Sequence, residues 1–208
     1  MTLHSDDVSK NISKEEKKNL PKQDNTKEPS FIDIENHWAK DAISYVVSKG
    51  YFKGIGGGKF APNHRITRAD FVTVLGRMAG ISPDHSTGNP FRDLRTTYYT
   101  PYVTWAYETG LVRGVGEARF DPDRPITREE MAIIISKFLQ LTGKKIEDKQ
   151  EQYFKDQSTI SPWAQEAIHD LSKKGVLNGM GDGQFSPKSS FTRAQVAQVL
   201  YSIDKNSK

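Results

Sequence analysis

The stretch Ile66-Thr67-Arg68-Ala69-Asp70 opens an amphipathic run, and it returns twice along the chain of 208 residues. The second copy is Ile126-Thr127-Arg128-Glu129-Glu130, and the third is Phe191-Thr192-Arg193-Ala194-Gln195. The arginines are 60 residues apart from 68 to 128 and 65 residues apart from 128 to 193. A recurrence at this period indicates three copies of one structural unit. Whatever the first arginine does is therefore expected of the other two.

The rest of the unit repeats with the arginine. Each copy contains, in order, Phe-x-Asp, an aromatic position, Gly-x-Gly and Phe-x-Pro. The marker residues are Asp33, Trp38, Gly54 and Phe60, then Asp93, Tyr98, Gly114 and Phe120, then Asp156, Trp163, Gly179 and Phe185. We expect repeats at 31–90, 91–152 and 153–208, the last with a short tail.

Residues 1–30 differ from the repeats in composition. They contain few large apolar side chains and many charged and polar ones, so they cannot bury enough surface to offset their ordering entropy. We expect a flexible leader or linker there, with no hydrophobic segment of a secretory signal. The whole chain has no apolar stretch long enough to span a membrane.

The charge and cysteine content exclude several classes of function. The net charge is +4, and basic residues are mixed with acidic ones rather than gathered in runs, so nothing indicates a nucleic-acid partner. The absence of cysteine removes disulfides, thiol catalysis and cysteine-ligated zinc. The five histidines do not recur between copies and show no metal-ligand spacing. We expect no catalytic residue, no metal and no cofactor.

Each copy is predicted to form a helix, a loop and a second helix. The first helices are expected at about 38–49, 101–109 and 162–174, the first of them with Gly50 as a C-terminal stop. The second helices begin at the threonines, because Thr-x-x-Glu or Thr-x-x-Gln is a capping box. The first copy, with Asp70 in the third position, is the weaker match.

The second helices carry the strongest periodicity in the chain. Apolar residues stand at i, i+3, i+4 and i+7, which places them on one helical face. They are Phe71, Val74, Leu75 and Met78, then Met131, Ile134, Ile135 and Phe138, then Val196, Val199, Leu200 and Ile203. We predict a mainly α fold in which these three helices pack around a pseudo-threefold axis. The first helices and glycine loops would form three lobes with a groove between neighbours.

The arginine is the one part of the motif that capping does not require. A cation in the first turn is slightly unfavourable against the helix dipole. Either it pairs with an internal carboxylate, or it points at an anionic ligand, helped by free amides of the helix N-terminus. Asp33, Asp93 and Asp156 could cap the first helices, contact sugar hydroxyls or contact the arginines. Trp38 and Trp163 could be lobe core or offer a flat face to a sugar ring.

Together these elements resemble the S-layer homology (SLH) domain family over residues 31–203. The resemblance implies a monomeric, three-lobed pseudotrimer with a central three-helix bundle. It implies a non-covalent anchor in the extracellular cell wall or S-layer of a bacterium. The implied partner is a pyruvylated secondary cell-wall polysaccharide with a terminal N-acetylmannosamine ketal.

Carried over residue by residue, the resemblance makes Arg68, Arg128 and Arg193 the candidate ligand-binding residues. Second-rank candidates are Asp33, Asp93, Asp156, Trp38, Trp163, Gly54, Gly114 and Gly179. The family's closing glutamate is Asp70 in the first copy and Gln195 in the third, so the three sites need not be equal. Replacing a motif arginine with alanine is expected to weaken binding while the fold survives, because these side chains are expected not to be needed in the core.

Two other functions fit the same residues. The first is a module that binds peptidoglycan or another protein, with its arginines paired internally. The second, more remote, is a glycan hydrolase module, which would require paired carboxylates in a cleft.

Overall fold

The computed structural model describes residues 30–84 and 88–208. Within these ranges the chain forms six α-helices, one 3-10 turn and isolated β-bridges, with no strand. The elements are α1 (Lys40–Ser48), α2 (Arg68–Met78), α3 (Thr100–Glu108), α4 (Arg128–Thr142), η2 (Gln157–Thr159), α5 (Pro162–Lys173) and α6 (Arg193–Asn206). The predicted helix-loop-helix units and the mainly α class are confirmed. The leader expected at 1–30 lies, apart from its last residue, outside the described ranges.

The threonines cap the second helices as the sequence predicts. The hydroxyls of Thr67, Thr127 and Thr192 accept the amide of the residue three positions on. The reciprocal half of the capping box is present in α4 and α6. In α2 the shorter Asp70 side chain does not return to the cap and instead accepts a hydrogen bond of 2.6 Å from the Tyr98 hydroxyl.

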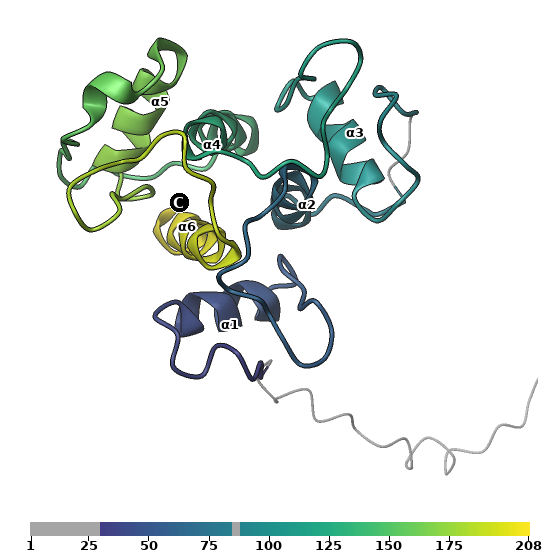
Figure 1. The fold of residues 1–208 in the computed structure, drawn as a ribbon, viewed down its shortest axis with the longest axis horizontal. Helices are drawn as coiled ribbons and strands as arrows, with labels where there is room; N and C mark the ends of the chain where they lie inside the picture. Colours follow the sequence, from purple (N-terminus) through teal and green to yellow (C-terminus); the bar gives the residue numbers. More distant parts are fainter. Residues whose placement is uncertain (1–29, 85–87) are drawn as a thin grey trace, which may run out of the picture.

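The three second helices lie together at the centre, and each first helix lies outside them (Figure 1). The closest helix pairs are α1 with α6, α2 with α3, and α4 with α5. Each first helix thus packs on the second helix of the preceding repeat, counted cyclically. All twelve residues of the predicted apolar stripes belong to one continuous core of buried side chains.

A closed ring of backbone hydrogen bonds joins the three linkers before the central helices. Ile66 N–H donates to the Phe191 carbonyl at 3.0 Å, Ile126 N–H to the Ile66 carbonyl at 3.2 Å, and Phe191 N–H to the Ile126 carbonyl at 3.2 Å. All three side chains are buried. Because each repeat supplies one donor and one acceptor, the ring is complete only when all three are in place.

The N-terminal amides of the central helices are already occupied. The N–H groups of Arg68, Arg128 and Arg193 each donate at 2.9 Å to a carbonyl of another repeat. The next amide in each helix also donates to another repeat, and the third is bound by the threonine hydroxyl. The expectation that these amides would help to hold an anion is therefore wrong.

Candidate functional site

The motif arginines clamp neighbouring repeats together. Only 6% of Arg68, 2% of Arg128 and 9% of Arg193 is exposed. In each, Nε donates to the carbonyl of the Phe-x-Pro phenylalanine of another repeat, and Nη2 donates to a carbonyl just before its Gly-x-Gly loop. For Arg128 these bonds are 2.6 Å to Phe185 and 2.7 Å to Asn178. The expectation that these arginines are not needed in the core is wrong.

The other two arginines repeat this geometry. Arg193 donates to Phe60 at 2.9 Å and to Lys53 at 2.8 Å, and Arg68 donates more loosely, to Phe120 at 3.1 Å and Arg113 at 3.4 Å. Each guanidinium also lies over the ring of the phenylalanine whose carbonyl it binds, at 4.5 to 4.8 Å from the centroid. The arginines thus bind backbone carbonyls, an arrangement that neither sequence-based alternative contained.

Two grooves open beside these arginines. The first, here called the α6 groove, has a cavity volume of about 320 Å³. Its lining includes the loop Val176–Met180 and α6 residues of the third repeat, Arg128 of the second and Trp38 of the first. All three repeats therefore contribute to one groove.

The second, here called the α2 groove, has a cavity volume of about 330 Å³ and the same plan advanced by one repeat. Its lining includes the loop Phe52–Ile55 and α2 residues of the first repeat, Tyr98 of the second and Arg193 of the third. It differs in charge, since Lys53, Asp70 and Arg77 also line it, whereas the α6 groove has no carboxylate in its lining.

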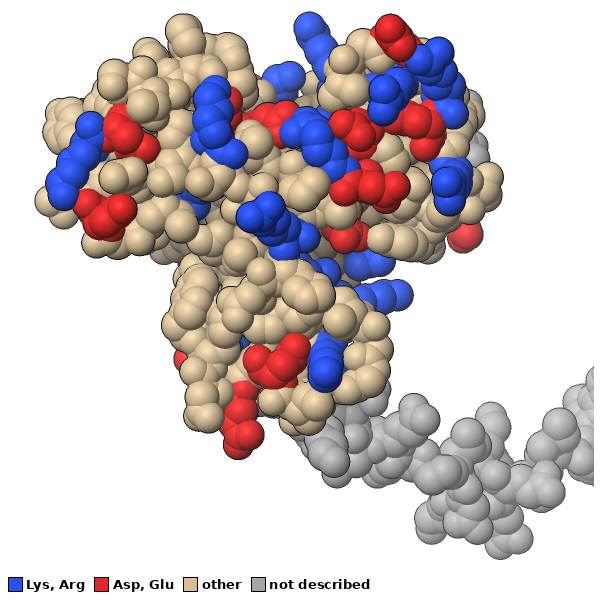
Figure 2. All heavy atoms as spheres, viewed as in Figure 1, with Lys and Arg blue, Asp and Glu red and all other residues tan. Residues whose placement is uncertain are grey.

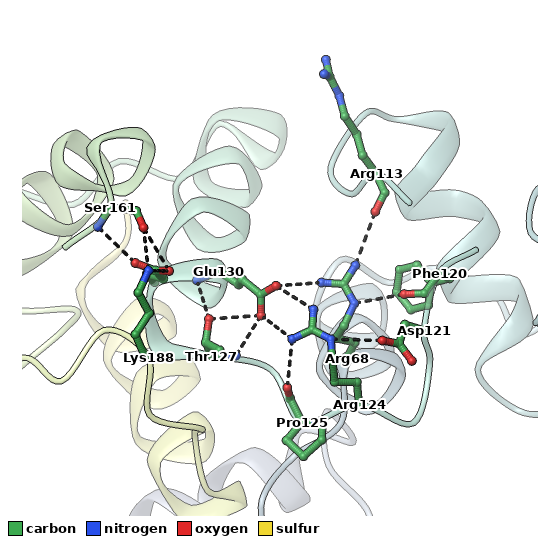
Figure 3. A network of polar contacts seen from close by, with 11 residues as sticks. Arg68, Arg113, Phe120, Asp121, Arg124, Pro125, Thr127, Glu130, Ser161 and Lys188 are labelled. Carbon is green, nitrogen blue, oxygen red and sulfur yellow. Dashed lines mark hydrogen bonds and ion pairs between the residues drawn. The ribbon is translucent and has the colours of Figure 1, made fainter. Parts of the chain in front are cut away.

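The corresponding position beside α4 holds an ion-pair network (Figure 3). Glu130 Oε1 lies 3.7 Å from Arg68 Nη1 and 2.7 Å from Arg124 Nη2. Arg124 Nη1 donates to Glu130 Oε2 at 3.2 Å, and its Nε lies 3.2 Å from Asp121. Burial would raise the pKa of Glu130, but the hydrogen bonds from Arg124 and Thr127 hold it below its ordinary value.

The third guanidinium nitrogen distinguishes Arg128 from Arg68. Among residues 30–84 and 88–208, Nη1 of Arg128 has no hydrogen-bond or ion-pair partner. The fully buried side-chain atoms without a partner in these ranges are Thr97 Oγ1 and Ser172 Oγ, so Nη1 of Arg128 keeps access to solvent. Burial lowers the pKa of Arg128 to about 10, opposed only by Asp156. Arg128 is thus a desolvated cation that has no ion-pair partner among the residues that the structure describes.

Burial lowers the pKa of the other two motif arginines as well. Glu130 acts in the opposite direction on Arg68, and Asp70 does so on Arg193. Arg193 has no ion pair within the described residues, because Asp70 is bound by Tyr98. The neighbouring carboxylate therefore differs among the three arginines. It is paired with Arg68, it is bound by Tyr98 instead of Arg193, and it is missing beside Arg128.

Exposed apolar side chains stand at equivalent positions of the three repeats. Trp38, Tyr98 and Trp163 are 65%, 60% and 55% exposed, so the alternative that the tryptophans are lobe core is wrong. The residue between the two loop glycines, which is Ile55, Val115 or Met180, is also about half exposed in every copy. Trp38 with Met180 and Tyr98 with Ile55 line the two grooves. Sequence reasoning missed these loop residues, although an apolar residue between two glycines in all three copies was a usable signal.

The loop glycines Gly54, Gly114 and Gly179 are required by packing of the chain on itself. A Cβ on Gly54 would lie 2.5 Å from the Phe31 ring, and one on Gly114 would lie 2.6 Å from the Arg119 carbonyl. The close approach is thus made by the protein's own Phe-x-Asp ring and loop backbone. Gly54 and Gly179 nonetheless line the grooves with their backbone.

The aspartates Asp33, Asp93 and Asp156 hold the Phe-x-Pro loops. Each carboxylate accepts two backbone amides at 2.7 to 2.9 Å, those of the phenylalanine and the residue after it. The second of these residues has a positive φ in every copy, a strained conformation that the two bonds hold in place. These carboxylates line neither groove and do not cap the first helices.

The chain belongs to the S-layer homology domain family, which matches residues 30–72, 90–132 and 153–197. It is similar to an amylopullulanase of Thermoanaerobacterium thermosulfurigenes, with 34% identity over 84% of this chain and 9% of the relative. It is 32% identical to the S-layer protein sap of Bacillus anthracis over 85% of this chain and 21% of the relative.

A cellulosome-anchoring protein of Acetivibrio thermocellus is 31% identical over 74% of this chain and 36% of the relative. The chain thus spans about a third or less of each of these three relatives. The repeat boundaries given above stay a prediction.

The described residues lack two features that would indicate other functions. None of their helices is both long and apolar enough to cross a membrane. They hold no group of three or more histidine, aspartate or glutamate side chains placed to bind a metal ion. On the face in Figure 2, acidic and basic side chains are interspersed and do not form one patch of a single sign.

Proposed function

We propose that this chain is a cell-wall anchor that binds an anionic, pyruvylated secondary cell-wall polysaccharide in the α6 and α2 grooves. Surface anchoring is supported by membership of the S-layer homology family and by relatives named as S-layer and cellulosome-anchoring proteins. The enzyme relative matches over only 9% of its length, which supports anchoring as the role of the shared segment. A role as a catalyst is not part of this proposal.

The observation that carries the ligand proposal is the free Nη1 of Arg128. A buried guanidinium without a carboxylate partner attracts an anion, and its charged hydrogen bonds are stronger than neutral ones. Nε and Nη2 are fixed by backbone carbonyls, so the remaining nitrogen is already oriented. Little side-chain entropy is then lost when a ligand binds.

The walls of the α6 groove suit a ketal of pyruvate on a sugar. Such a group presents a fixed carboxylate beside a methyl group, and the sugar adds one apolar face and several hydroxyls. The carboxylate would meet Arg128, and Trp38 and Met180 would supply the apolar walls. Gln195 and Gln198 line the same groove, and their amides can both donate to and accept from hydroxyls.

Isothermal titration with purified wall polysaccharide, before and after chemical removal of pyruvate, tests the proposal. We expect binding of the native polymer and a loss of at least about tenfold in affinity without pyruvate, since each factor of ten is about 1.4 kcal/mol. Equal affinity for the two forms would refute recognition of the ketal. Strong binding to peptidoglycan stripped of the polysaccharide would favour the alternative module.

A pair of exposed aromatic variants locates the site. Trp38→Ala should weaken binding, because this side chain lines the α6 groove. Tyr153→Ala removes an aromatic side chain that is 71% exposed and lines neither groove, so it is the matched control. An equal loss in both variants would contradict the assignment to the groove.

A further inference from the structure

The third residue of each central helix differs among the copies, and its contacts differ with it. Glu130 bonds to its own cap and lies within ion-pair distance of Arg68. Gln195 also bonds to its cap, but its amide nitrogen lies 3.7 Å from the Met180 sulfur. Asp70 makes neither contact and is bound by Tyr98. The neighbouring arginine therefore meets a paired carboxylate at Glu130, a neutral amide at Gln195, or a carboxylate that is bound by another side chain at Asp70.

The middle repeat carries further charges that hold Glu130 against its arginine. Arg124 forms two hydrogen bonds with Glu130 and an ion pair with Asp121. The equivalent positions in the other copies are His64 and Ser189 for Arg124, and Ala61 and Ser186 for Asp121. The chain Asp121–Arg124–Glu130–Arg68 therefore occurs at one of the three equivalent positions, where the second repeat meets Arg68 of the first (Figure 3).

We propose that this third helix residue decides which groove accepts an anionic ligand: Glu130 occupies Arg68 and closes the position beside α4, whereas Gln195 leaves Arg128 for the ligand. The inference rests on the proposed function. A ligand carboxylate beside α4 would have to displace Glu130 and would meet its negative charge. Beside α6 it meets an amide.

The third residue of α4 or α6 can be exchanged between glutamate and glutamine without loss of the helix cap. Glutamate in α4 and glutamine in α6 both form the complete capping box. Gln195→Glu therefore adds a carboxylate beside Arg128, and Glu130→Gln removes one beside Arg68, while both helices keep their caps. Gln140→Glu, at an exposed position of α4 outside both grooves, is a control for the change in net charge.

The α2 groove is intermediate between the closed position beside α4 and the open α6 groove. Asp70 lies in its lining, but the Tyr98 hydroxyl holds the carboxylate away from ion-pair contact with Arg193. Tyr98→Phe removes that hydroxyl and frees Asp70 to approach the arginine. We therefore expect Tyr98→Phe to weaken binding in this groove and to leave the α6 groove unchanged.

The experiment measures two properties of each variant, with pyruvylated N-acetylmannosamine as the probe and its pyruvate-free form as the control sugar. Titration gives affinity and the number of sites, and thermal unfolding without sugar reports pairing of the arginine. For Gln195→Glu we expect at least about tenfold weaker binding at one site and a higher melting temperature, because the desolvated Arg128 gains a partner. For Glu130→Gln we expect one additional site and a lower melting temperature.

The outcomes separate the two proposals. If the wild type does not bind the pyruvylated probe, the proposed function fails, while the opposite shifts in melting temperature still test the pairing. If the wild type binds but Gln195→Glu binds equally well, or Glu130→Gln gains no site, the inference is overturned and the proposed function stands. A loss of binding in Gln140→Glu as large as in Gln195→Glu would also overturn it, because net charge alone would then explain the effect.

Discussion

Replacing Arg128 with alanine should destabilise the fold, which is a stronger claim than loss of binding. The side chain is 2% exposed and donates to two carbonyls at 2.6 and 2.7 Å. A hydrogen bond from a charged group contributes about 1.5–3 kcal/mol net, so the two bonds give about 3 kcal/mol at the lower bound. Loss of the contacts with the Phe185 and Phe191 rings increases the destabilisation, whereas removal of a desolvated cation decreases it. We expect the free energy of unfolding to fall by about 3 kcal/mol.

Urea denaturation followed by circular dichroism measures this change as a lower midpoint at an unchanged slope. Arg95→Ala, at an exposed position, is the matched control and should change stability by no more than about 0.5 kcal/mol. Arg68→Ala should cost less than Arg128→Ala, because its bonds are longer, at 3.1 and 3.4 Å. A loss below about 1 kcal/mol for Arg128→Ala would refute the clamp, because a single ordinary hydrogen bond accounts for that much.

Two further predictions concern the loops. Burial would raise the pKa of Asp33, Asp93 and Asp156, but the amide hydrogen bonds lower it below the ordinary 3.8. The stability that these carboxylates contribute is therefore complete above pH 3.8 and is lost as the pH falls through their lower pKa values in the folded state. Melting temperatures measured from pH 5 downward should fall accordingly, and Asp93→Asn should make the melting temperature less dependent on pH. Gly114→Ala would place a Cβ 2.6 Å from a backbone carbonyl, against 2.9 Å at Gly179, so it should destabilise by about 1–3 kcal/mol. Gly179→Ala should cost less, and the reverse order in denaturation would contradict the packing argument.

Much of the fold was predictable because local rules and tertiary packing agree in these repeats. The threonine caps fixed where α2, α4 and α6 begin, and the weaker box at Asp70 was visible in the sequence. The apolar stripes at i, i+3, i+4 and i+7 identified the buried faces of these helices. Repetition strengthened both signals, since each appeared three times with different residues.

The roles of the polar residues were less predictable, because their partners are backbone groups. A carbonyl before a glycine loop has no signature in the sequence, so the bond of Arg128 to Asn178 could not be anticipated. The same holds for the two amides that bind Asp33. For the arginines, sequence reasoning considered only carboxylate and ligand partners. For the aspartates it considered the amides of the first helices but not those of the Phe-x-Pro loops. It also treated Gln195 as a feature of the third copy alone, whereas the fold places this residue in the groove of Arg128, which belongs to the second copy.

The cyclic exchange of residues between repeats explains why the grooves differ although the motif repeats. Each groove takes its arginine from one repeat, its third helix residue and loop from the next, and its aromatic wall from the one after. A substitution in one repeat therefore changes a groove whose other parts are unaltered. An arginine suits this arrangement because its planar fork can hold two carbonyls and still present a third nitrogen, which the single ammonium of lysine cannot do with the same rigidity. Alanine replacement of an arginine would remove the clamp and the proposed ligand contact together, so the proposed role in binding is tested only by changing a neighbour in the same groove, such as Gln195 beside Arg128.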